Sequence, residues 1–219
     1  MSRVDVWLAR HPPVDALGLC YGRADVPLAA SAESAAAELH ATLAGTRVSV
    51  LWSSPSSRCA NVAKVLAQTR GVELRIDARL FEIDFGDWEG RPWSDIERDD
   101  GVTYSRWMNE WKHTSPPNGE TIAVLTARVE AWLTDLRASA APADYIASPV
   151  IVAHAGVIRA LWVLVDGVTW EDAMARNVPH LGWQRLTLDP RPTHSPVRPV
   201  PDEVAPPCPA PLAASLRDG

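Results

Sequence analysis

The stretch PVIVAHAGVIRALW, residues 149–162, changes its pattern at one histidine. Residues 149–154 form an apolar run rich in β-branched side chains, which is typical of a buried strand. After it, apolar residues recur at helical spacing, and a helix is expected over about 156–166. His154 therefore lies at a junction, where a strand ends and a helix is about to begin.

The same order of strand and helix repeats along the chain. Further strands are expected at 4–9, 48–53 and 73–77, with a weaker one at 184–189, and further helices at about 31–44, 55–69 and 121–136. This alternation predicts an α/β fold, a single three-layer α/β/α domain whose central sheet is mostly parallel and carries helices on both faces.

Composition divides the chain into two parts. Nine of the 19 prolines lie in residues 190–219, and so dense a set of prolines cannot sustain a helix or a central strand. We expect one domain over residues 1–189 and a Pro-rich flexible tail over 190–219. A chain of 219 residues that is 47% hydrophobic is long enough to form one well-packed core.

The bulk numbers also exclude several kinds of partner. A net charge of −6 argues against nonspecific binding of nucleic acid, which needs a basic surface. The first residues lack the long apolar run of a signal peptide, and no segment is apolar enough to span a membrane. Three widely spaced cysteines without a C-x-x-C pair fit reduced thiols, so a cytoplasmic location is expected. A homodimer is left open.

Cationic side chains and imidazoles follow three of the expected strands. Arg10 and His11 end the first, Arg58 lies in SSPSSRC after the second, and His154 ends the fourth. Ser54 is a candidate helix N-cap with Pro55 at the first helical position. Ligands of parallel α/β sheets bind at the carboxyl ends of strands, and helix N-termini favour anions. We therefore expect a phosphate pocket, although each residue alone could be purely structural.

This pocket suggests a reaction. Neutral imidazole can attack phosphorus, two arginines can hold the phosphoryl oxygens, and a general acid must then protonate the leaving alcohol. The segment FEIDFGDWEG, residues 81–90, supplies the acid. Its alternation of apolar and acidic residues predicts an extended segment with Glu82 and Asp84 on one face. This pattern does not choose between the two carboxyl groups.

Four motifs in order resemble the histidine phosphatase superfamily, which has the phosphoglycerate-mutase-like fold. They are LARHPPV, SSPSSRC, FEIDFGDWEG and VAHAGVIRAL, and together they cover roughly residues 4–165. Within that superfamily, GLCYGRADVPL, FGDWEGRPW and PPNGET resemble bacterial α-ribazole phosphatases, which act late in cobalamin assembly. The resemblance implies a phosphatase acting on a small-molecule phosphomonoester, with no cofactor and no metal.

The resemblance also implies a role for each site residue. His11 is the expected nucleophile, Arg10 and Arg58 the phosphate ligands, Glu82 the acid, and His154 the second imidazole that stabilises the transferring phosphoryl group. Three further residues are expected to contact the substrate, and these are Tyr21, Gly22 and Ala155.

The chain departs from the family pattern just after His11. The family places Gly, then Ser or Thr, then Asn, where this sequence has Pro12, Val14 and Leu17. Pro12 has no N–H to donate, but it restricts the backbone of His11. We interpret the prolines as stiffening a working nucleophile, with Tyr21 and Gly22 lining the side that the Asn would occupy.

Two other functions remain open. One is an isomerase of the phosphoglycerate mutase type, which the short interval of about 70 residues between Glu82 and His154 argues against. The other is a catalytically inert module that only binds phosphate, suggested by Pro12 and the missing Asn. Separately, Trp107 and Trp111 are spaced to share a helix face, either packing a cap onto the core or covering the pocket.

Overall fold

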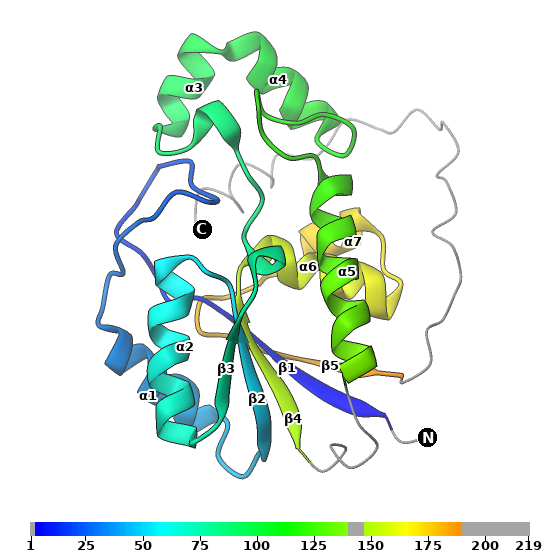
Figure 1. Ribbon diagram of the computed structural model, residues 1–219. Coiled ribbons are helices and arrows are strands. Elements are labelled where there is room, and N and C mark those ends of the chain that lie inside the picture. Colours follow the sequence, from blue (N-terminus) through cyan, green and yellow to red (C-terminus); the bar gives the residue numbers. More distant parts are fainter. Residues whose placement is uncertain (1–2, 140–146, 190–219) are drawn as a thin grey trace.

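The computed structural model describes residues 3–139 and 147–189 and contains a five-stranded sheet of order β3-β2-β4-β1-β5. Its strands are β1 (Val4–Arg10), β2 (Val48–Ser53), β3 (Glu73–Ile76), β4 (Ser148–Ala153) and β5 (Trp183–Leu188). The first four are parallel, and β5 pairs antiparallel with β1 (Figure 1). The predicted α/β class and all five predicted strands are confirmed.

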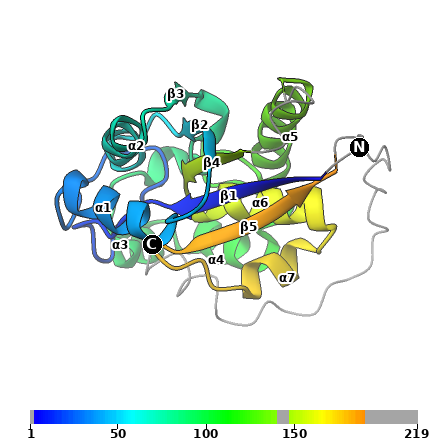
Figure 2. The ribbon, with the colours of Figure 1, turned by 90° about the horizontal axis from the view of Figure 1, so that it is seen from below.

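Helices cover both faces of this sheet, as predicted. One face carries α1 (Ala32–Thr42) and α2 (Ser57–Arg70), and the other carries α5 (Ile122–Ser139), α6 (Ala155–Asp166) and α7 (Trp170–Ala175) (Figure 2). Alternate residues of β4 supply the two cores. Val150 and Val152 pack with the buried side chains of α1 and α2, whereas Ile151 and Ala153 pack with those of α5 and α6.

A small cap of two helices lies above the sheet. It consists of α3 (Trp93–Asp99) and α4 (Gly101–Glu110), reached from β3 through the short 3₁₀ turns η1 (Ala78–Leu80) and η2 (Gly86–Trp88). The cap is held by aromatic packing, in which Trp93 and Trp107 stack with ring centroids 6.2 Å apart and Trp88 meets Trp107 edge-on at 5.5 Å. Trp107 and Trp111 are both buried, as expected for a cap packed on the core.

One local prediction is wrong. The helix after β2 begins at Ser57, so Ser54 is not its N-cap and Arg58 is its second residue. The Ser54 hydroxyl instead bonds the His154 ring. The acid segment, residues 81–85, lies outside the sheet, and the carbonyls of Phe81 and Glu82 accept hydrogen bonds from the Arg128 side chain.

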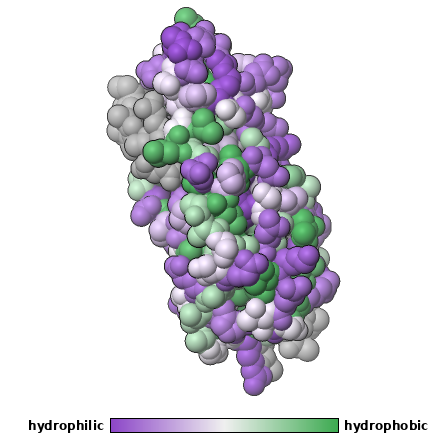
Figure 3. Space-filling view, turned by 90° about the vertical axis from the view of Figure 1, so that its left-hand side faces the viewer, coloured by the Kyte–Doolittle hydropathy of each residue, from purple (hydrophilic) through white to green (hydrophobic). Residues whose placement is uncertain are grey.

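The surface is mostly hydrophilic on one face (Figure 3), and the described cysteines are buried thiols. On the face shown in Figure 3, hydrophilic residues predominate over the cap and the apolar patches below are small and interrupted. Cys20 and Cys59 are buried free thiols, as expected, while Cys208 and the predicted tail lie outside the described residues. Within the described part, no helix has both the length and the apolar character needed to cross a membrane.

Candidate active site

His11 and His154 are brought together by the register of two parallel strands. Arg10, the last residue of β1, lies opposite Ala153, the last residue of β4, so the residues that follow are also neighbours. The His11 N–H donates to the Ala153 carbonyl at 2.9 Å, and the two imidazole centroids lie 5.2 Å apart. Both rings are almost fully buried. Adjacent strand ends thus place two imidazoles side by side.

Pro12 fixes the tautomer of His11. The Nδ1 atom of His11 lies 2.8 Å from the Pro12 carbonyl oxygen, which can only accept, so Nδ1 carries the proton. Nε2 is then left with a lone pair, which is the form a nucleophile needs. Burial holds the pKa of His11 well below its ordinary value, and the positive charges of Arg58 and Arg10 lower it further. The ring is therefore neutral near pH 7.

Arg58 is completely buried and approaches the two histidines from α2. Its Nη atoms donate to the carbonyls of Ala24, at 2.9 Å, and Gly22, and its guanidinium carbon lies 5.3 Å from the centre of the Tyr21 ring. The Nε of Arg58 and the hydroxyl of Tyr21 are buried with no hydrogen-bond partner in the described chain. Since buried polar groups are rarely left unpaired, these two donors in contacting residues suit an anionic ligand.

Arg10 approaches from the end of β1. Its Nη1 donates at 2.8 Å to the carbonyl of Val178, in the loop between α7 and β5. Arg10 and Arg58 both lower the pKa of His11 and of His154, so both charges act on the same pair of rings. The four cationic and imidazole residues predicted at the strand ends therefore meet in one place.

His154 is held in the complementary tautomer. Its Nδ1 lies 3.3 Å from Nη2 of Arg58, which can only donate, so Nδ1 accepts and Nε2–H donates to the Ser54 hydroxyl at 2.8 Å. Burial, followed by the charge of Arg58, lowers the pKa of His154. Ala155, the first residue of α6, is also buried and follows this ring directly.

Glu82, not Asp84, lies at this helix. Oε2 of Glu82 accepts from the Gly156 N–H at 3.0 Å, so the carboxyl group lies at the start of α6, beside His154. A Cβ at residue 156 would lie 2.2 Å from Oε1 of Glu82, so the close approach requires glycine. The Asp84 carboxyl accepts from the Gly86 N–H and pairs with Arg23 at 3.3 Å.

A family model described as histidine phosphatase superfamily (branch 1) matches residues 6–195. The chain belongs to the histidine phosphatase superfamily. It is 30% identical to the adenosylcobalamin/alpha-ribazole phosphatase of Escherichia coli K12, over 84% of this chain and 90% of that protein. It is 29% identical to a putative phosphoserine phosphatase of Hydrogenobacter thermophilus, over 84% of this chain and 89% of that one.

A solved structure agrees with this assignment. The crystal structure of a putative alpha-ribazole-5'-P phosphatase from Escherichia coli K-12 superposes with a TM-score of 0.76 at 29% identity, covering 85% of this chain and 91% of that one. The enzyme is therefore a histidine phosphatase, and the phosphoglycerate-mutase-like fold expected from the motifs is confirmed.

Arg128 supports the acid segment of this histidine phosphatase, and the sequence alone did not reveal it. From α5, its guanidinium donates to the carbonyls of Arg79, Phe81 and Glu82 at 2.6–2.9 Å and to both carboxylate oxygens of Glu120. This side chain thereby helps to fix a segment that pairs with no strand in the described part of the chain. No local pattern signals this, since Arg128 is 46 residues from Glu82 and resembles any other helical arginine.

Glu89 and His180 were also missed. The Glu89 carboxylate accepts from the N–H groups of Gly22, Arg23, Ala24 and Phe85, which ties the loop beside Arg58 to the acid segment. The His180 ring lies 5.0 Å from that of His11, and its Nδ1 bonds the His11 carbonyl at 2.9 Å. A histidine just before the fifth predicted strand could have indicated this contact. A strand antiparallel to β1 begins where β1 ends, so residues just before it lie near His11.

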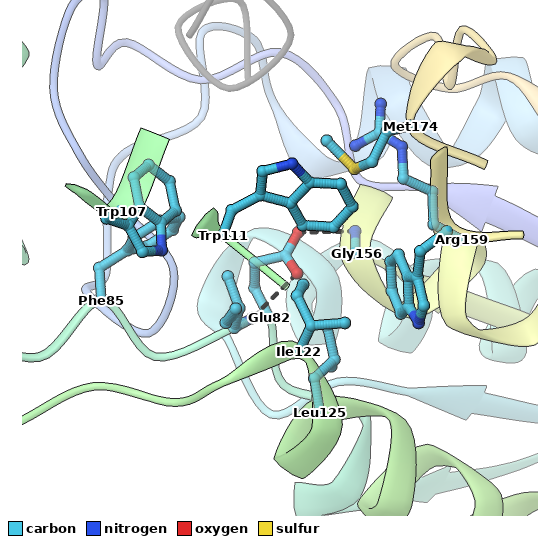
Figure 4. A pocket seen from close by; sticks show the side chains of 11 residues that line it. Glu82, Phe85, Trp107, Trp111, Ile122, Leu125, Gly156, Arg159 and Met174 are labelled. Atoms are coloured by element: carbon cyan, nitrogen blue, oxygen red, sulfur yellow. Dashed lines mark hydrogen bonds between the residues drawn. The ribbon is translucent and has the colours of Figure 1, made fainter. Parts of the chain in front are cut away.

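Beside Glu82 lies an apolar pocket (Figure 4). Its lining is mostly apolar and consists of Ile83, Phe85, Trp107, Trp111, Ile122, Leu125, Trp170 and Met174. The other three lining residues are the charged Glu82 and Arg159 and the glycine Gly156. Arg159 is buried and its Nε donates to the Ala173 carbonyl of α7 at 3.2 Å, and burial lowers its pKa to about 10. The general-acid candidate thus stands between the histidine pair and an aromatic chamber.

Proposed function

We propose that this histidine phosphatase is a metal-independent phosphomonoesterase that forms a covalent phosphohistidine on His11. The observation that carries the proposal is the state of the His11 ring. The ring is buried and neutral, and its Nδ1–H donates to the Pro12 carbonyl. The positive charges of Arg58 and Arg10 lie close enough to lower its pKa. Such a ring has a lone pair on Nε2 and positive charge close by to hold a phosphate.

In the first step, Nε2 of His11 attacks phosphorus and the bond from phosphorus to the alcohol oxygen breaks. The electron pair stays with that oxygen, which takes a proton from Glu82 and leaves as the neutral alcohol. Arg10, Arg58 and His154 stabilise the charge on the three remaining phosphoryl oxygens. The Arg58 Nε and Tyr21 hydroxyl, both without partners in the described chain, support a phosphate bound here.

In the second step, water replaces the imidazole. The Glu82 carboxylate takes a proton from water as its oxygen attacks phosphorus, the bond from phosphorus to Nε2 breaks, and the electron pair returns to His11. Inorganic phosphate leaves, and both side chains are restored to their starting forms. Gly156 supports this assignment, because its N–H holds the Glu82 carboxyl group beside His154.

We propose α-ribazole 5′-phosphate as the substrate, with other sugar or nucleotide phosphates as the broader class. Support comes from the names of the relatives, at 30% identity over nine-tenths of the Escherichia coli protein, and from the aromatic chamber beside Glu82. A phosphoglycerate mutase activity would instead require the phosphohistidine to survive exposure to water.

Phosphate release in EDTA tests the proposal. We expect wild type to hydrolyse p-nitrophenyl phosphate and α-ribazole 5′-phosphate in EDTA, His11→Ala to lose at least about 10³-fold in kcat, and His40→Ala, which removes an imidazole from the remote α1, to remain active. Activity that needs added metal, or that survives in His11→Ala, would contradict it. Transfer of phosphate between carbons of a phosphoglycerate, without release, would establish the mutase.

A further inference from the structure

We propose that the apolar chamber beside Glu82 is the site of the leaving alcohol and that Trp111 and Trp170 select esters whose alcohol carries a planar aromatic group. This inference rests on the proposed function, because the chamber has a catalytic meaning only if Glu82 protonates a leaving alcohol. Four observations carry it: the position of the chamber, its lining, the pairing of its two tryptophans and its present volume.

The position of the chamber defines which part of a substrate it takes. It shares Glu82 and Gly156 with the reaction site, and its lining includes neither of the two histidines nor the two arginines of the phosphate pocket. A phosphoryl group held by those four residues therefore lies outside the chamber. The alcohol oxygen must reach the Glu82 carboxyl group to gain its proton, so the rest of the alcohol extends into the chamber.

The lining favours an apolar, planar occupant. Eight of the 11 lining residues are apolar, and three of these are tryptophans. Stripping water from a carboxylate or ammonium group in such surroundings is costly unless the group is paired. The one cation, Arg159, donates to the backbone carbonyls of Ala173 and Arg176 at the end of α7, so it braces that helix. Aromatic rings, by contrast, pack favourably against tryptophan.

Two neighbouring contacts close the chamber. Trp111 at the end of α4 meets Trp170 at the start of α7 edge-on, with centroids 6.5 Å apart and planes at 76°. The next residue of each, Lys112 and Glu171, form an ion pair. The cap and α7 are thus joined by one aromatic and one ionic contact over the chamber, and Figure 4 shows the Trp111 ring above the Glu82 carboxyl group.

The volume means that an aromatic occupant requires the chamber to widen. The chamber holds about 40 Å³, which admits a few water molecules and no aromatic ring. A substrate ring enters only when the two tryptophans part, and it then replaces their mutual contact with contacts to itself. Met174, which is flexible, lies in the same wall and can repack around the occupant.

Paired substrates test this assignment. α-Ribazole 5′-phosphate and ribose 5-phosphate share the phosphate and the primary alcohol and differ by the aromatic base. We expect wild type to prefer the aromatic ester in kcat/KM by roughly 10- to 100-fold, the range that stacking of one base supplies. Trp111→Leu and Trp170→Leu should each remove most of that preference, mainly through KM, and leave ribose 5-phosphate hydrolysis within about threefold.

Control variants separate recognition from folding. Trp7→Leu removes a tryptophan that contacts Trp183 and packs against the core on the other face of the sheet, under α1 and α2. This variant should keep the preference for the aromatic ester. Trp111→Phe retains a ring and should keep most of it. Trp170 is only partly buried, so Trp170→Leu is informative if Trp111→Leu does not fold. A preference unchanged in both leucine variants, or an equal loss for the two substrates, would overturn the proposal.

Failure of the proposed function would be seen separately. If wild type hydrolyses neither ester, the phosphatase assignment for these substrates fails, and calorimetry of α-ribazole 5′-phosphate binding then tests the chamber without catalysis. Weaker binding by Trp111→Leu and Trp170→Leu than by wild type and Trp7→Leu supports the chamber as the aromatic site, whereas equal binding by all four proteins overturns it.

Discussion

At the scale of single residues, the site depends on a few backbone groups that fix ionisable side chains. The Pro12 carbonyl sets the tautomer of His11, and the Gly156 N–H sets the place of Glu82. The prolines after His11 are therefore compatible with the proposed nucleophile, because the group that the ring uses is a carbonyl, which proline retains. Each of these contacts leads to a separate experiment.

Replacing Pro12→Gly should reduce stability more than chemistry. Glycine keeps the accepting carbonyl but frees the unfolded backbone, so the free energy of unfolding should fall by about 0.5–1 kcal/mol. We expect kcat to stay within about fivefold of wild type. Urea unfolding together with steady-state kinetics measures both quantities. A loss of kcat comparable to that of His11→Ala would show that proline itself, and not its carbonyl, is needed.

Replacing Gly156→Ala should affect chemistry more than stability. The new Cβ would lie 2.2 Å from Oε1 of Glu82, and the carboxyl group must move because it is the flexible end of a side chain. We expect kcat to fall roughly 10²-fold, the lower end of what general acid catalysis contributes, with little change in melting temperature. Gly101→Ala, where a Cβ would meet no atom within 4 Å and the backbone has no positive φ, is the control for adding a methyl group. Full activity in Gly156→Ala would remove Glu82 from its assigned role.

The two buried histidines predict a loss of stability in mild acid. Their pKa values in the folded protein lie well below 6.5, whereas in the unfolded chain they are ordinary. As pH falls below about 6.5, the unfolded chain binds protons that the folded protein does not, so the free energy of unfolding decreases. Urea unfolding at pH 7.5 and 5.5 should show this, with a smaller decrease in His154→Gln. A free energy of unfolding independent of pH over this interval would be inconsistent with neutral buried rings.

At the scale of secondary structure elements, the strands were predictable and the acid segment was not. Apolar runs specify β1 and β4, and residues that follow adjacent parallel strands must meet, so His11 and His154 could be paired from sequence. Residues 81–85 show alternation but form no strand. Their backbone groups instead bond the Arg128 side chain on α5, the backbone and side chain of Glu120, and the Glu89 carboxylate. For the same reason, the choice between Glu82 and Asp84 required the structure.

Arg128 should therefore act as a positioning residue for Glu82. Arg128→Ala removes hydrogen bonds to three carbonyls and leaves the half-buried Glu120 carboxylate without this partner, so we expect a loss of about 2–4 kcal/mol in the free energy of unfolding. We also expect kcat to fall more than KM changes, with partial recovery in Arg128→Lys. Arg137→Ala, lower on the same helix, is the matched control. A rise in KM with kcat unchanged would instead place Arg128 in substrate binding.

At the scale of the whole molecule, topology assembles the site. The order β3-β2-β4-β1-β5 puts the strand ends that carry His11, Arg58 and His154 next to one another, while the cap and α7 enclose the space beside Glu82. The gathering of these strand-end residues follows from general rules for parallel sheets, so it was predictable from the sequence. The cap, Arg159 and the Trp111–Trp170 contact depend on packing between segments about 60 residues apart, which no local pattern encodes.

The most direct test of the account is detection of the covalent intermediate. Glu82→Gln is mixed with ³²P-labelled p-nitrophenyl phosphate, whose nitrophenolate leaving group needs no proton. The variant should accumulate a phosphoenzyme, because hydrolysis of the phosphohistidine lacks its general base. We predict label that resists alkali, is lost in acid, and maps to His11 in a proteolytic digest. Label on any other residue, or phosphate release by His11→Ala at the wild-type rate, would contradict the central claim that His11 is the nucleophile.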